Sequence, residues 1–372
     1  MSRWRAACVL SGTLAAGLAL SGCGSGGRDA PPERVLSIYN WADYIGKTTI
    51  ADFEKETGIK VDYDTFDGDH TLEAKMLAGG SGYDVVSTTT NFFSRQIKAG
   101  AYQKLDRSRL TRWNNLDPQT LALMAASDPG NAYGVPYLHA INGFAYNVPM
   151  IRARMPDAPV ESLDLIFKPE YIRRFADCGV TFLDSPEDVL QLALNYLHLD
   201  PNSTRPEDFA AAERLLLAVR PWIRTYDSAE FMSGLANQEL CIAMSWSSDY
   251  AVVMERARDA GINLRLAFTV PREGSNMTYN AWLIPYDAPH VAEAHEFLNF
   301  MLRPDVIAKV TNDTRYGNDN LAAGHLVDPR ILQDPTLYPT PEITRRLYLT
   351  DEVNAATERL RTRIWTRIKT AH

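Results

Sequence analysis

The stretch that decides the fold spans residues 35–87 and reads VLSIYNWADYIGKTTIADFEKETGIKVDYDTFDGDHTLEAKMLAGGSGYDVVS. It contains three short strand-like segments, at residues 35–39, 59–64 and 83–87. Helix-like segments at 48–57 and 71–78 separate them, and each is followed by a glycine, where a helix C-cap belongs. This β-α-β-α-β order predicts a parallel sheet in a doubly wound α/β domain.

Strand-like and helix-like segments continue beyond this stretch. Further strands are expected at residues 179–183, 240–245, 263–269 and 281–284. Further helices are expected at residues 186–199, 206–219, 250–260 and 291–302, and in the Arg-rich tail from residue 340. In open parallel sheets, ligands bind beyond the carboxyl ends of the strands, so residues directly after a strand are the first candidates for a site.

The N-terminal segment has the pattern of a lipoprotein signal peptide. A basic start precedes an apolar run at 6–20, which is too short to span a bilayer and leads into LSGC at 20–23. An ordinary signal peptide with a chance cysteine is the alternative. We predict a signal peptide at 1–22 and a mature chain that begins at an acylated Cys23. The Gly- and Pro-rich segment 23–33 would link this anchor to the folded part.

The charge of the chain argues against nucleic acid as a partner. The 372 residues carry 46 acidic and 38 basic side chains, a net charge of −8, and the basic residues form no stripe. A mildly acidic exported protein suits a cationic ligand, although acidity also serves solubility alone. The chain is long enough for two domains with cores of their own.

The four cysteines fit an oxidising compartment. Cys8 leaves with the predicted signal peptide and Cys23 carries the lipid, so Cys178 and Cys241 remain. Two thiols in such a compartment predict one disulfide, and two buried free thiols are the alternative. No Cys-x-x-Cys motif points to a redox or metal role.

Two short clusters follow predicted strands: NWADY at 40–44 and SWSSDY at 245–250. Each combines an indole, a carboxylate and a phenol. Aromatic faces attract cations, and a carboxylate offers charge-assisted hydrogen bonds to an ammonium, so a site with one cluster on each wall suits a small amine. The alternative is structural, because Asp43 and Asp249 each precede a predicted helix and suit the role of N-cap or dipole partner.

Motifs for catalysis and metal binding are absent from the sequence. The seven histidines have no metal-binding spacing, and no Gly-x-Ser-x-Gly elbow occurs. Asp62, Asp64, Asp67 and Asp69 lack the glycine and the distal glutamate of an EF-hand loop. We therefore expect no catalytic residue, no metal and no cofactor. An exported hydrolase with paired carboxylates is the alternative from another functional class.

The chain also resembles a known family over nearly all of the predicted mature protein. The resemblance rests on YNWADYI (39–45), DFEKETGIKV (52–61), NNLDP (114–118), DPNST (200–204), FLNFMLRPDV (297–306) and RTRIWT (361–366). In these segments, which follow one another in order, the chain resembles the extracytoplasmic polyamine-binding proteins of bacterial ABC importers, of the putrescine-binding type.

The resemblance implies an α/β, type II periplasmic-binding-protein fold, with two doubly wound lobes joined by a hinge and the ligand in the cleft. Residues 34–138 and 250–303 would form lobe 1, and residues 139–249 and 304–372 lobe 2. It also implies a monomeric, non-enzymatic periplasmic protein, anchored to a membrane through Cys23. Such a protein captures a putrescine-like diamine and passes it to the membrane permease of an ABC importer by hinge closure.

Carried over by position, the implied ligand-binding residues are Trp41, Ala42, Asp43, Tyr44, Thr89, Asp188, Trp246, Asp249, Asn280 and Tyr316. Cys178 and Cys241 match disulfide positions of these relatives. The chain departs from them in carrying Asp188 in place of Glu, Thr278 in place of Phe and Asn280 in place of Asp. The last change removes a charge that would pair with an ammonium. A mono-amine carboxylate such as 5-aminovalerate, or an acylated diamine such as γ-glutamylputrescine, is therefore the alternative ligand.

Overall fold

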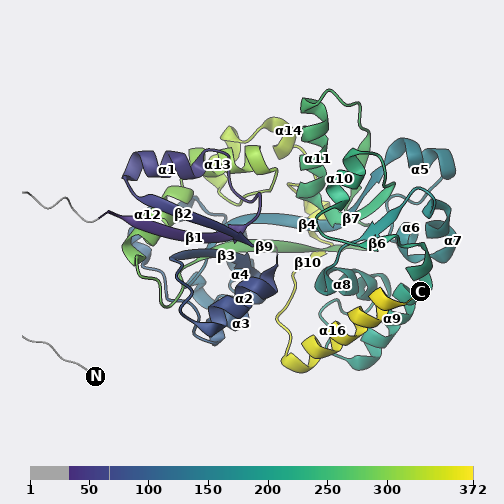
Figure 1. Cartoon of the computed structure of the whole chain (residues 1–372), viewed down its shortest axis with the longest axis horizontal. Helices are drawn as coiled ribbons and strands as arrows, with labels where there is room; N and C mark the ends of the chain where they lie inside the picture. Colours follow the sequence, from purple (N-terminus) through teal and green to yellow (C-terminus); the bar gives the residue numbers. More distant parts are fainter. Residues whose placement is uncertain (1–32, 67, 372) are drawn as a thin grey trace, which may run out of the picture. The chain divides into compact units, whose positions relative to one another are not determined.

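Figure 1 shows a computed structural model of the chain, which describes residues 33–66 and 68–371. All of its helices and strands lie in one compact unit. The predicted signal peptide at 1–22, the acylated Cys23 and all but the last residue of the linker at 23–33 lie outside the described residues. Within the described part of the chain, no helix combines the length and apolar character needed to cross a membrane.

The first part of the folded unit forms the parallel sheet that the sequence predicts. Its elements are β1 (Val35–Trp41), α1 (Thr49–Thr57), β2 (Lys60–Phe66), α2 (Asp69–Ala78) and β3 (Val85–Thr89). β1 pairs in parallel with both β2 and β3. α1 ends at Gly58, whose φ of 70° lies in the left-handed region and whose N–H donates to the Glu54 carbonyl at 2.9 Å. A side chain would be strained in this conformation, so the glycine sets where the helix ends.

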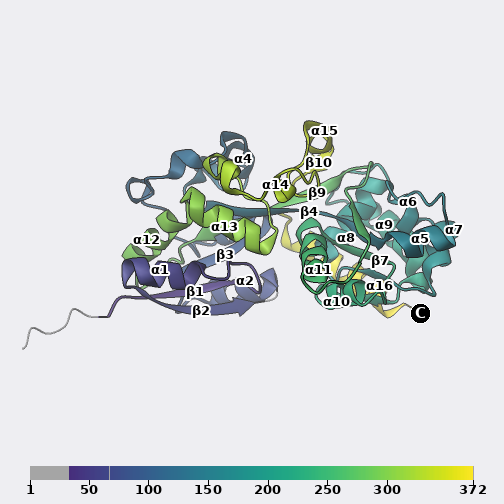
Figure 2. The ribbon, with the colours of Figure 1, turned by 90° about the horizontal axis from the view of Figure 1, so that it is seen from above.

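Two long strands run side by side through the middle of the folded unit (Figures 1 and 2). They are β4 (Val135–Asn147) and β9 (Ser275–Leu283), and they pair antiparallel. The main path through the ten-stranded sheet has the order β2-β1-β3-β9-β4-β7-β5-β6, and β8 and β10 pair with β4 and β9 off this path. The sequence pattern predicts only the end of β9, at 281–284, and misses β4. β4 is buried at nearly every position, so it lacks the alternation of apolar and polar residues by which a strand is recognised.

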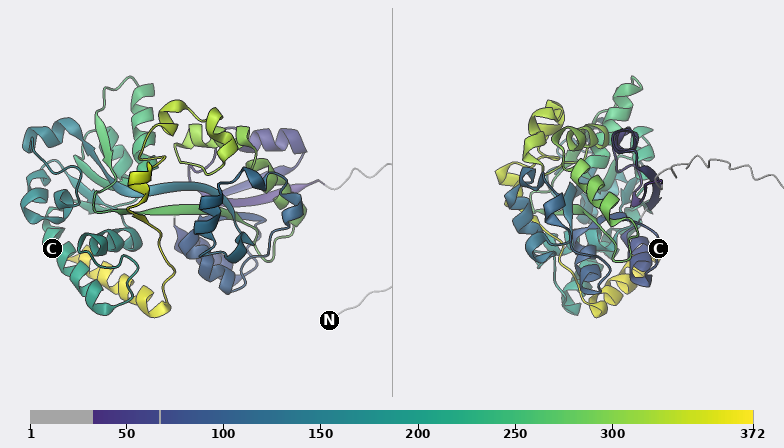
Figure 3. Two further views of the ribbon diagram at one scale, coloured as in Figure 1. Left: turned by 180° about the vertical axis from the view of Figure 1, so that it is seen from behind. Right: turned by 90° about the vertical axis from the view of Figure 1, so that its left-hand side faces the viewer.

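The second part of the sheet contains three of the strands predicted beyond residue 178, together with a two-residue strand at Thr225–Tyr226 that the sequence pattern misses. It contains β5 (Val180–Phe182), β6 (Thr225–Tyr226), β7 (Ile242–Trp246) and β8 (Leu266–Thr269). The helices around it include α8 (Pro186–Tyr196), α9 (Pro206–Val219), α11 (Ser247–Asp259) and the C-terminal α16 (Ala355–Thr370). α16, yellow in Figure 3, lies against α9, where Arg367 forms an ion pair with Glu213 at 2.6 Å.

The remaining elements are short helices and one short strand. They are α3 (Thr90–Lys98), α4 (Pro118–Met124), α5 (Val148–Arg154), α6 (Asp164–Phe167), α7 (Pro169–Ile172), α10 (Phe231–Ala236), α12 (Val291–Met301), α13 (Pro304–Thr314), α14 (Pro329–Leu332), α15 (Pro341–Thr344) and β10 (Leu347–Tyr348). Several of them, like α8 and α9, carry proline in the first turn. Proline suits this position because the first N–H groups of a helix have no partner within the helix.

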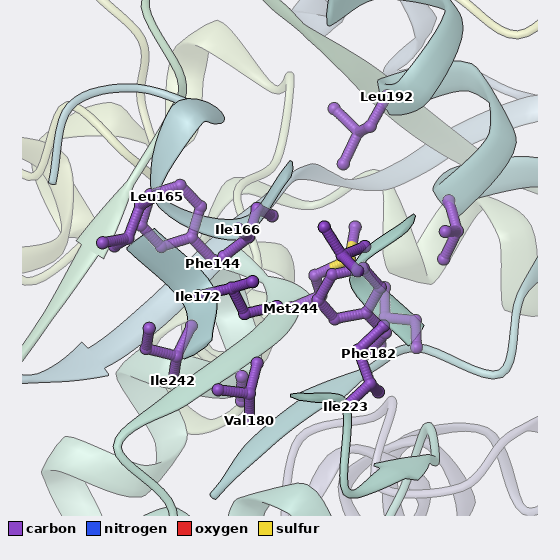
Figure 4. Close-up of a cluster of buried hydrophobic side chains, with 14 of the residues drawn as sticks. Phe144, Leu165, Ile166, Ile172, Val180, Phe182, Leu192, Ile223, Ile242 and Met244 are labelled. Carbon is purple, nitrogen blue, oxygen red and sulfur yellow. The ribbon is translucent and has the colours of Figure 1, made fainter. Parts of the chain in front are cut away.

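The apolar core around β5 and β7 contains a disulfide. Phe144, Phe182 and Met244, from three neighbouring strands, are fully buried in this core (Figure 4). Cys178 and Cys241 are bonded, with a Cα–Cα distance of 5.6 Å, and join the segments that lead into β5 and β7. The predicted disulfide is thereby confirmed.

Two further apolar clusters lie around the other end of the sheet. Leu36 of β1 packs in one of them with Val310 of α13. Val253 of α11, by contrast, packs in the core that Figure 4 shows. This grouping differs from the predicted lobe boundaries at 250 and 304. Buried residues of α13 and β1 belong to one apolar cluster, whereas α11 follows β7 directly and packs in the same cluster as β7.

Candidate functional site

One face of the central sheet carries polar side chains at alternating positions. Asn276, Thr278 and Asn280 are spaced by two along β9, so their side chains lie on the same face of the strand. Asn280 pairs directly with Thr89 at the end of β3, and Thr278 pairs with Ala140 of β4. Residues directly opposite each other in antiparallel strands point to the same side of a sheet. These side chains therefore form one continuous surface.

The same surface continues onto β7. Asn142 lies two residues beyond Ala140 on β4 and pairs with Trp246, the last residue of β7. Together these side chains form the polar face, which consists of Thr89, Asn142, Trp246, Asn276, Thr278 and Asn280. The polar face thus extends from the end of β3 to the end of β7, across both long strands.

Buried amide atoms on the polar face have no hydrogen-bond partner within the described residues. They are both side-chain polar atoms of Asn142 and the Oδ1 atoms of Asn276 and Asn280. A buried polar group without a partner costs about 1–3 kcal/mol, and folded proteins satisfy nearly all such groups. Their concentration on one face indicates a place where a polar molecule binds.

Asp188 meets the polar face at Asn276. Its carboxylate accepts hydrogen bonds from Asn276 Nδ2 and from Ser185 Oγ, each at 2.8 Å. Ser185 is the N-cap of α8, which places Asp188 in the first turn of that helix. Burial raises the pKa of Asp188 to about 6, although the hydrogen bonds from Asn276, Ser185 and Trp246 favour the charged form. Asp188 is therefore a charged but poorly solvated acceptor at pH 7.

Asp249 lies in the first turn of α11 and accepts a hydrogen bond from the Tyr316 hydroxyl at 3.0 Å. The N-cap of α11 is Trp246, so the alternative that Asp249 is itself the N-cap is wrong. Burial raises the pKa of Asp249 to about 7, although Tyr316 and Arg256 favour the charged form. A buried carboxylate with such a pKa gains free energy when a cation binds to it.

Tyr44 joins these groups from the segment after β1. Asn280 Nδ2 donates to the Tyr44 hydroxyl at 2.8 Å, and the Tyr44 ring lies edge-on to Tyr316 with 4.3 Å between centroids. Burial raises the pKa of Tyr44 well above its usual value, and the charges of Asp249 and Asp69 raise it further. The phenol therefore stays neutral, accepts from Asn280 and keeps its own O–H to donate.

Asp69 is a third carboxylate and is half-buried, and it is not among the residues that the sequence singles out for ligand binding. Thr88 Oγ1 donates to its Oδ1 at 2.7 Å, and Thr89 Oγ1 donates to its Oδ2 at 2.9 Å. Burial raises the pKa of Asp69 to about 6. In sequence it figures only in the rejected calcium motif. The rule that sites follow strand ends could have found it, since Asp69 begins α2 shortly after β2.

The cluster at 40–44 divides between the interior and the surface. Tyr44 is buried and Trp41 is half-buried, whereas Ala42 and Asp43 are exposed. The Asp43 side chain is 86% exposed and lies 3.8 Å from Arg256 of α11. The residues gathered at or beside the polar face are thus Tyr44, Thr89, Asp188, Trp246, Asp249, Asn280 and Tyr316.

One group of side chains has the composition of a metal site. His70 of α2, Glu187 of α8 and Glu358 of α16 have ligand atoms within 4.8 Å of one another. Arg95 and Arg361, however, each approach Glu358 at 3.9 Å. Because their positive charges repel a metal cation, the group is better described as part of an ion-pair network that links four helices, α2, α3, α8 and α16.

The polar face therefore offers more acceptors than donors to a ligand, and its charged groups are all acceptors. Asp69, Asp188 and Asp249 are carboxylates, and the unpartnered amide oxygens of Asn276 and Asn280 are neutral acceptors. Ammonium groups carry three N–H donors and one positive charge, which match this set. The chemistry of the face favours an amine.

Comparison with known sequences supports a transport role. A family model described as bacterial extracellular solute-binding protein matches residues 48–337. The putrescine-binding periplasmic protein PotF of Escherichia coli is 42% identical, and the match covers 91% of this chain and 92% of PotF. The putrescine-binding periplasmic protein SpuD of Pseudomonas aeruginosa is also 42% identical, over 95% of this chain and 96% of SpuD. These relatives are binding proteins and not enzymes, so the hydrolase alternative has no support.

A solved structure has the same fold. The spermidine/putrescine ABC transporter substrate-binding protein PotD of Streptococcus pneumoniae superimposes with a TM-score of 0.77 at 26% identity. The superposition covers 91% of this chain and 99% of that chain. The predicted periplasmic-binding-protein fold is confirmed, and so is the resemblance on which it rests.

Proposed function

We propose, because this chain belongs to the family of bacterial extracellular solute-binding proteins, that it captures a small polyamine and delivers it to an ABC importer. PotF and SpuD carry putrescine in their names, which makes a putrescine-like diamine the first ligand to test. The protein would act by binding and release, without covalent chemistry.

The observation that carries this proposal is the set of three carboxylates, Asp69, Asp188 and Asp249, beside the polar face. Burying a carboxylate is costly unless a cation pairs with it. An ammonium supplies that charge, and its remaining N–H groups match the unpartnered oxygens of Asn276 and Asn280. A diamine brings two such groups.

A second class of ligand is supported by the neutral amides. Both polar atoms of Asn142 are unpartnered, and an amide donates as well as accepts. A mono-amine carboxylate such as 5-aminovalerate, or an acylated diamine such as γ-glutamylputrescine, would use the carboxylates at one end and amide N–H groups at the other. The transport role would be the same.

We propose hinge closure as the way in which the ligand is held. The core around β1 and the core around β5 and β7 would act as two lobes, which are connected by the long strands β4 and β9 and by the segment between α14 and α16. Tyr316 and Asp249 come from different cores, and so do Arg315 and Glu255, which lie 2.8 Å apart. Contacts of this kind favour a closed form, and a bound amine would add to them.

The proposed location is the periplasm, with the mature chain tethered to a membrane through lipid on Cys23. The proposal rests on the LSGC sequence at 20–23 and on the periplasmic relatives. Cys23→Ser should release the protein from the membrane fraction in uncleaved or mis-processed form. Unchanged membrane partition, with a mature N-terminus elsewhere, would contradict the anchor but not the binding function.

The function is tested with a ligand panel. The purified protein is melted with putrescine, cadaverine, spermidine, agmatine, γ-glutamylputrescine or 5-aminovalerate. A ligand at 100 times its dissociation constant stabilises the folded state by about 2.7 kcal/mol, which is a clear rise in melting temperature. Mass spectrometry should recover the stabilising amine unchanged. The absence of any shift across the panel would contradict amine binding.

A further inference from the structure

We infer that Asp69 is a specificity-determining residue, which places a negative charge at the β3 end of the polar face and selects ligands with two ammonium groups. The assignment rests on the proposed amine-binding function and adds to it a residue and a ligand class.

Two threonine hydroxyls hold Asp69 in place. Thr88 donates to one carboxylate oxygen at 2.7 Å and Thr89 donates to the other at 2.9 Å. A carboxylate offers about four acceptor positions, so the two hydroxyls leave acceptor capacity for a ligand. Because both oxygens are fixed, the charge has a defined position and costs no further ordering when a ligand binds.

The position of Asp69 follows from the register of the sheet. Thr89, which bonds to Asp69, lies directly opposite Asn280 on β9. The Asn280 amide in turn donates to Tyr44 at 2.8 Å. Both Asp69 and Asp249 act on the Tyr44 hydroxyl electrostatically. The Asn280 and Tyr44 pair is thus connected to both carboxylates, through Thr89 to Asp69 and through Tyr316 to Asp249.

The negative charge of Asp69 is not balanced by the protein. Within the described residues, no Lys, Arg or His nitrogen forms an ion pair with Asp69, and Glu187 adds a like charge in its surroundings. Asn280 is neutral and cannot supply a charge of either sign. A cation that reaches this end of the polar face would therefore find an uncompensated carboxylate.

This charge discriminates between the two ligand classes proposed above. A diamine bound through one ammonium at Asp249 or Asp188 presents its second ammonium to Asp69, which attracts it. An ω-amino acid in the same orientation would present a carboxylate, which Asp69 repels. Asp69 therefore favours putrescine-like ligands over 5-aminovalerate.

The test compares putrescine with butylamine, a chain of the same length with one ammonium, by calorimetry on the full mature chain. In Asp69→Asn the amide oxygen accepts from one threonine hydroxyl and the amide nitrogen donates to the other, so both contacts can be kept while the charge is lost. The dissociation constant for putrescine should rise roughly 30-fold or more, whereas that for butylamine should change by less than about threefold. Asp62→Asn, which removes an exposed carboxylate from β2, should leave both constants unchanged. Asp69→Ser is a second neutral replacement if the amide variant does not fold.

A charge-transfer variant sharpens the test. Asp69→Asn combined with Asn280→Asp moves the carboxylate from α2 to β9. This double variant should recover much of the preference for putrescine over butylamine. An unchanged preference in Asp69→Asn, with putrescine still bound by the parent, overturns the role of Asp69 alone. If neither amine binds the parent and 5-aminovalerate does, the role of Asp69 is overturned while the transport proposal stands. If nothing on the panel binds, both fall.

Discussion

The hydroxyl of Tyr316 donates a hydrogen bond to the carboxylate of Asp249 at 3.0 Å, although the two residues come from different cores of the protein. Asp249 is in α11, which packs with β7, and Tyr316 follows α13, which packs with β1. The bond therefore connects the core around β1 with the core around β5 and β7. Its acceptor, Asp249, is a carboxylate whose ionisation is made costly by burial. An ammonium bound at Asp249 would meet Tyr316 as well.

Asp249→Asn should weaken amine binding. The substitution keeps an acceptor for Tyr316 but removes the charge that would pair with an ammonium. We expect a loss of roughly 2–5 kcal/mol in the free energy of binding, measured by calorimetry. Asp259→Asn, at the exposed end of the same helix, is the matched control and should bind as the parent does. Equal affinity of the two variants would place the ligand elsewhere.

The ligand-free protein should lose stability as the pH rises from 5 to 8. The pKa of Asp249 is raised from 3.8 to about 7 by burial, so its stabilising contribution is complete below about pH 4 and is lost as the pH rises through about 7. Ionisation of Asp249 in turn favours an ammonium, so amine affinity should increase over the same range.

Melting temperatures of the parent and of Asp249→Asn, each measured with and without putrescine, distinguish the titration of Asp249 from that of other carboxylates. The parent should show the steeper fall between about pH 4 and 7, and saturating putrescine should flatten it. Parallel curves for the two proteins would mean that Asp249 is ionised at little cost, contrary to its burial.

An element of this fold can be predicted from the sequence when the pattern that identifies it lies within neighbouring residues. β1, β2 and β3 are predicted because apolar strands and glycine-terminated helices follow one another within about fifty residues. β4 is missed because nearly every position is buried, which removes the alternation that identifies a strand. Its burial depends on β7, β8 and β9, which come more than ninety residues later in the chain.

The site shows the same division between local and distant signals. Tyr44 and Asp249 are found because they follow strand ends, where ligands of such sheets bind. Tyr316 and Asp188 enter only through the family resemblance, since their contacts with Asp249 and Asn276 bridge 67 and 88 residues. Asp69 is not predicted as a ligand-binding residue, because acidic residues are common in the first turn of a helix, where they stabilise the helix itself.

Loss of the disulfide should destabilise the core around β5 and β7. Cys178 and Cys241 are buried and close a loop with a sequence separation of 63. Replacing both with alanine should lower the free energy of unfolding by roughly 2–5 kcal/mol in denaturant titrations. Non-reducing peptide mapping of the exported protein should recover the linked pair. Two alkylatable thiols in that protein would show that the bond does not form.

Hinge closure can be tested at an ion pair that joins the two cores. Arg315 and Glu255 lie 2.8 Å apart, with side chains only 12% and 25% exposed, and Glu255→Gln removes the charge without changing the size. We expect a larger radius of gyration for the ligand-free variant in small-angle scattering, because an open form loses nothing by the substitution. With saturating ligand the radius should match that of the parent, and affinity should fall about two- to fivefold, as for a pair worth up to about 1 kcal/mol.

Glu213→Gln is the matched control, because Glu213 pairs with Arg367 at 2.6 Å within a single core and cannot bias closure. If both variants scatter like the parent while amine binding is intact, Arg315 and Glu255 do not hold two moving lobes together, and closure must depend on the ligand alone.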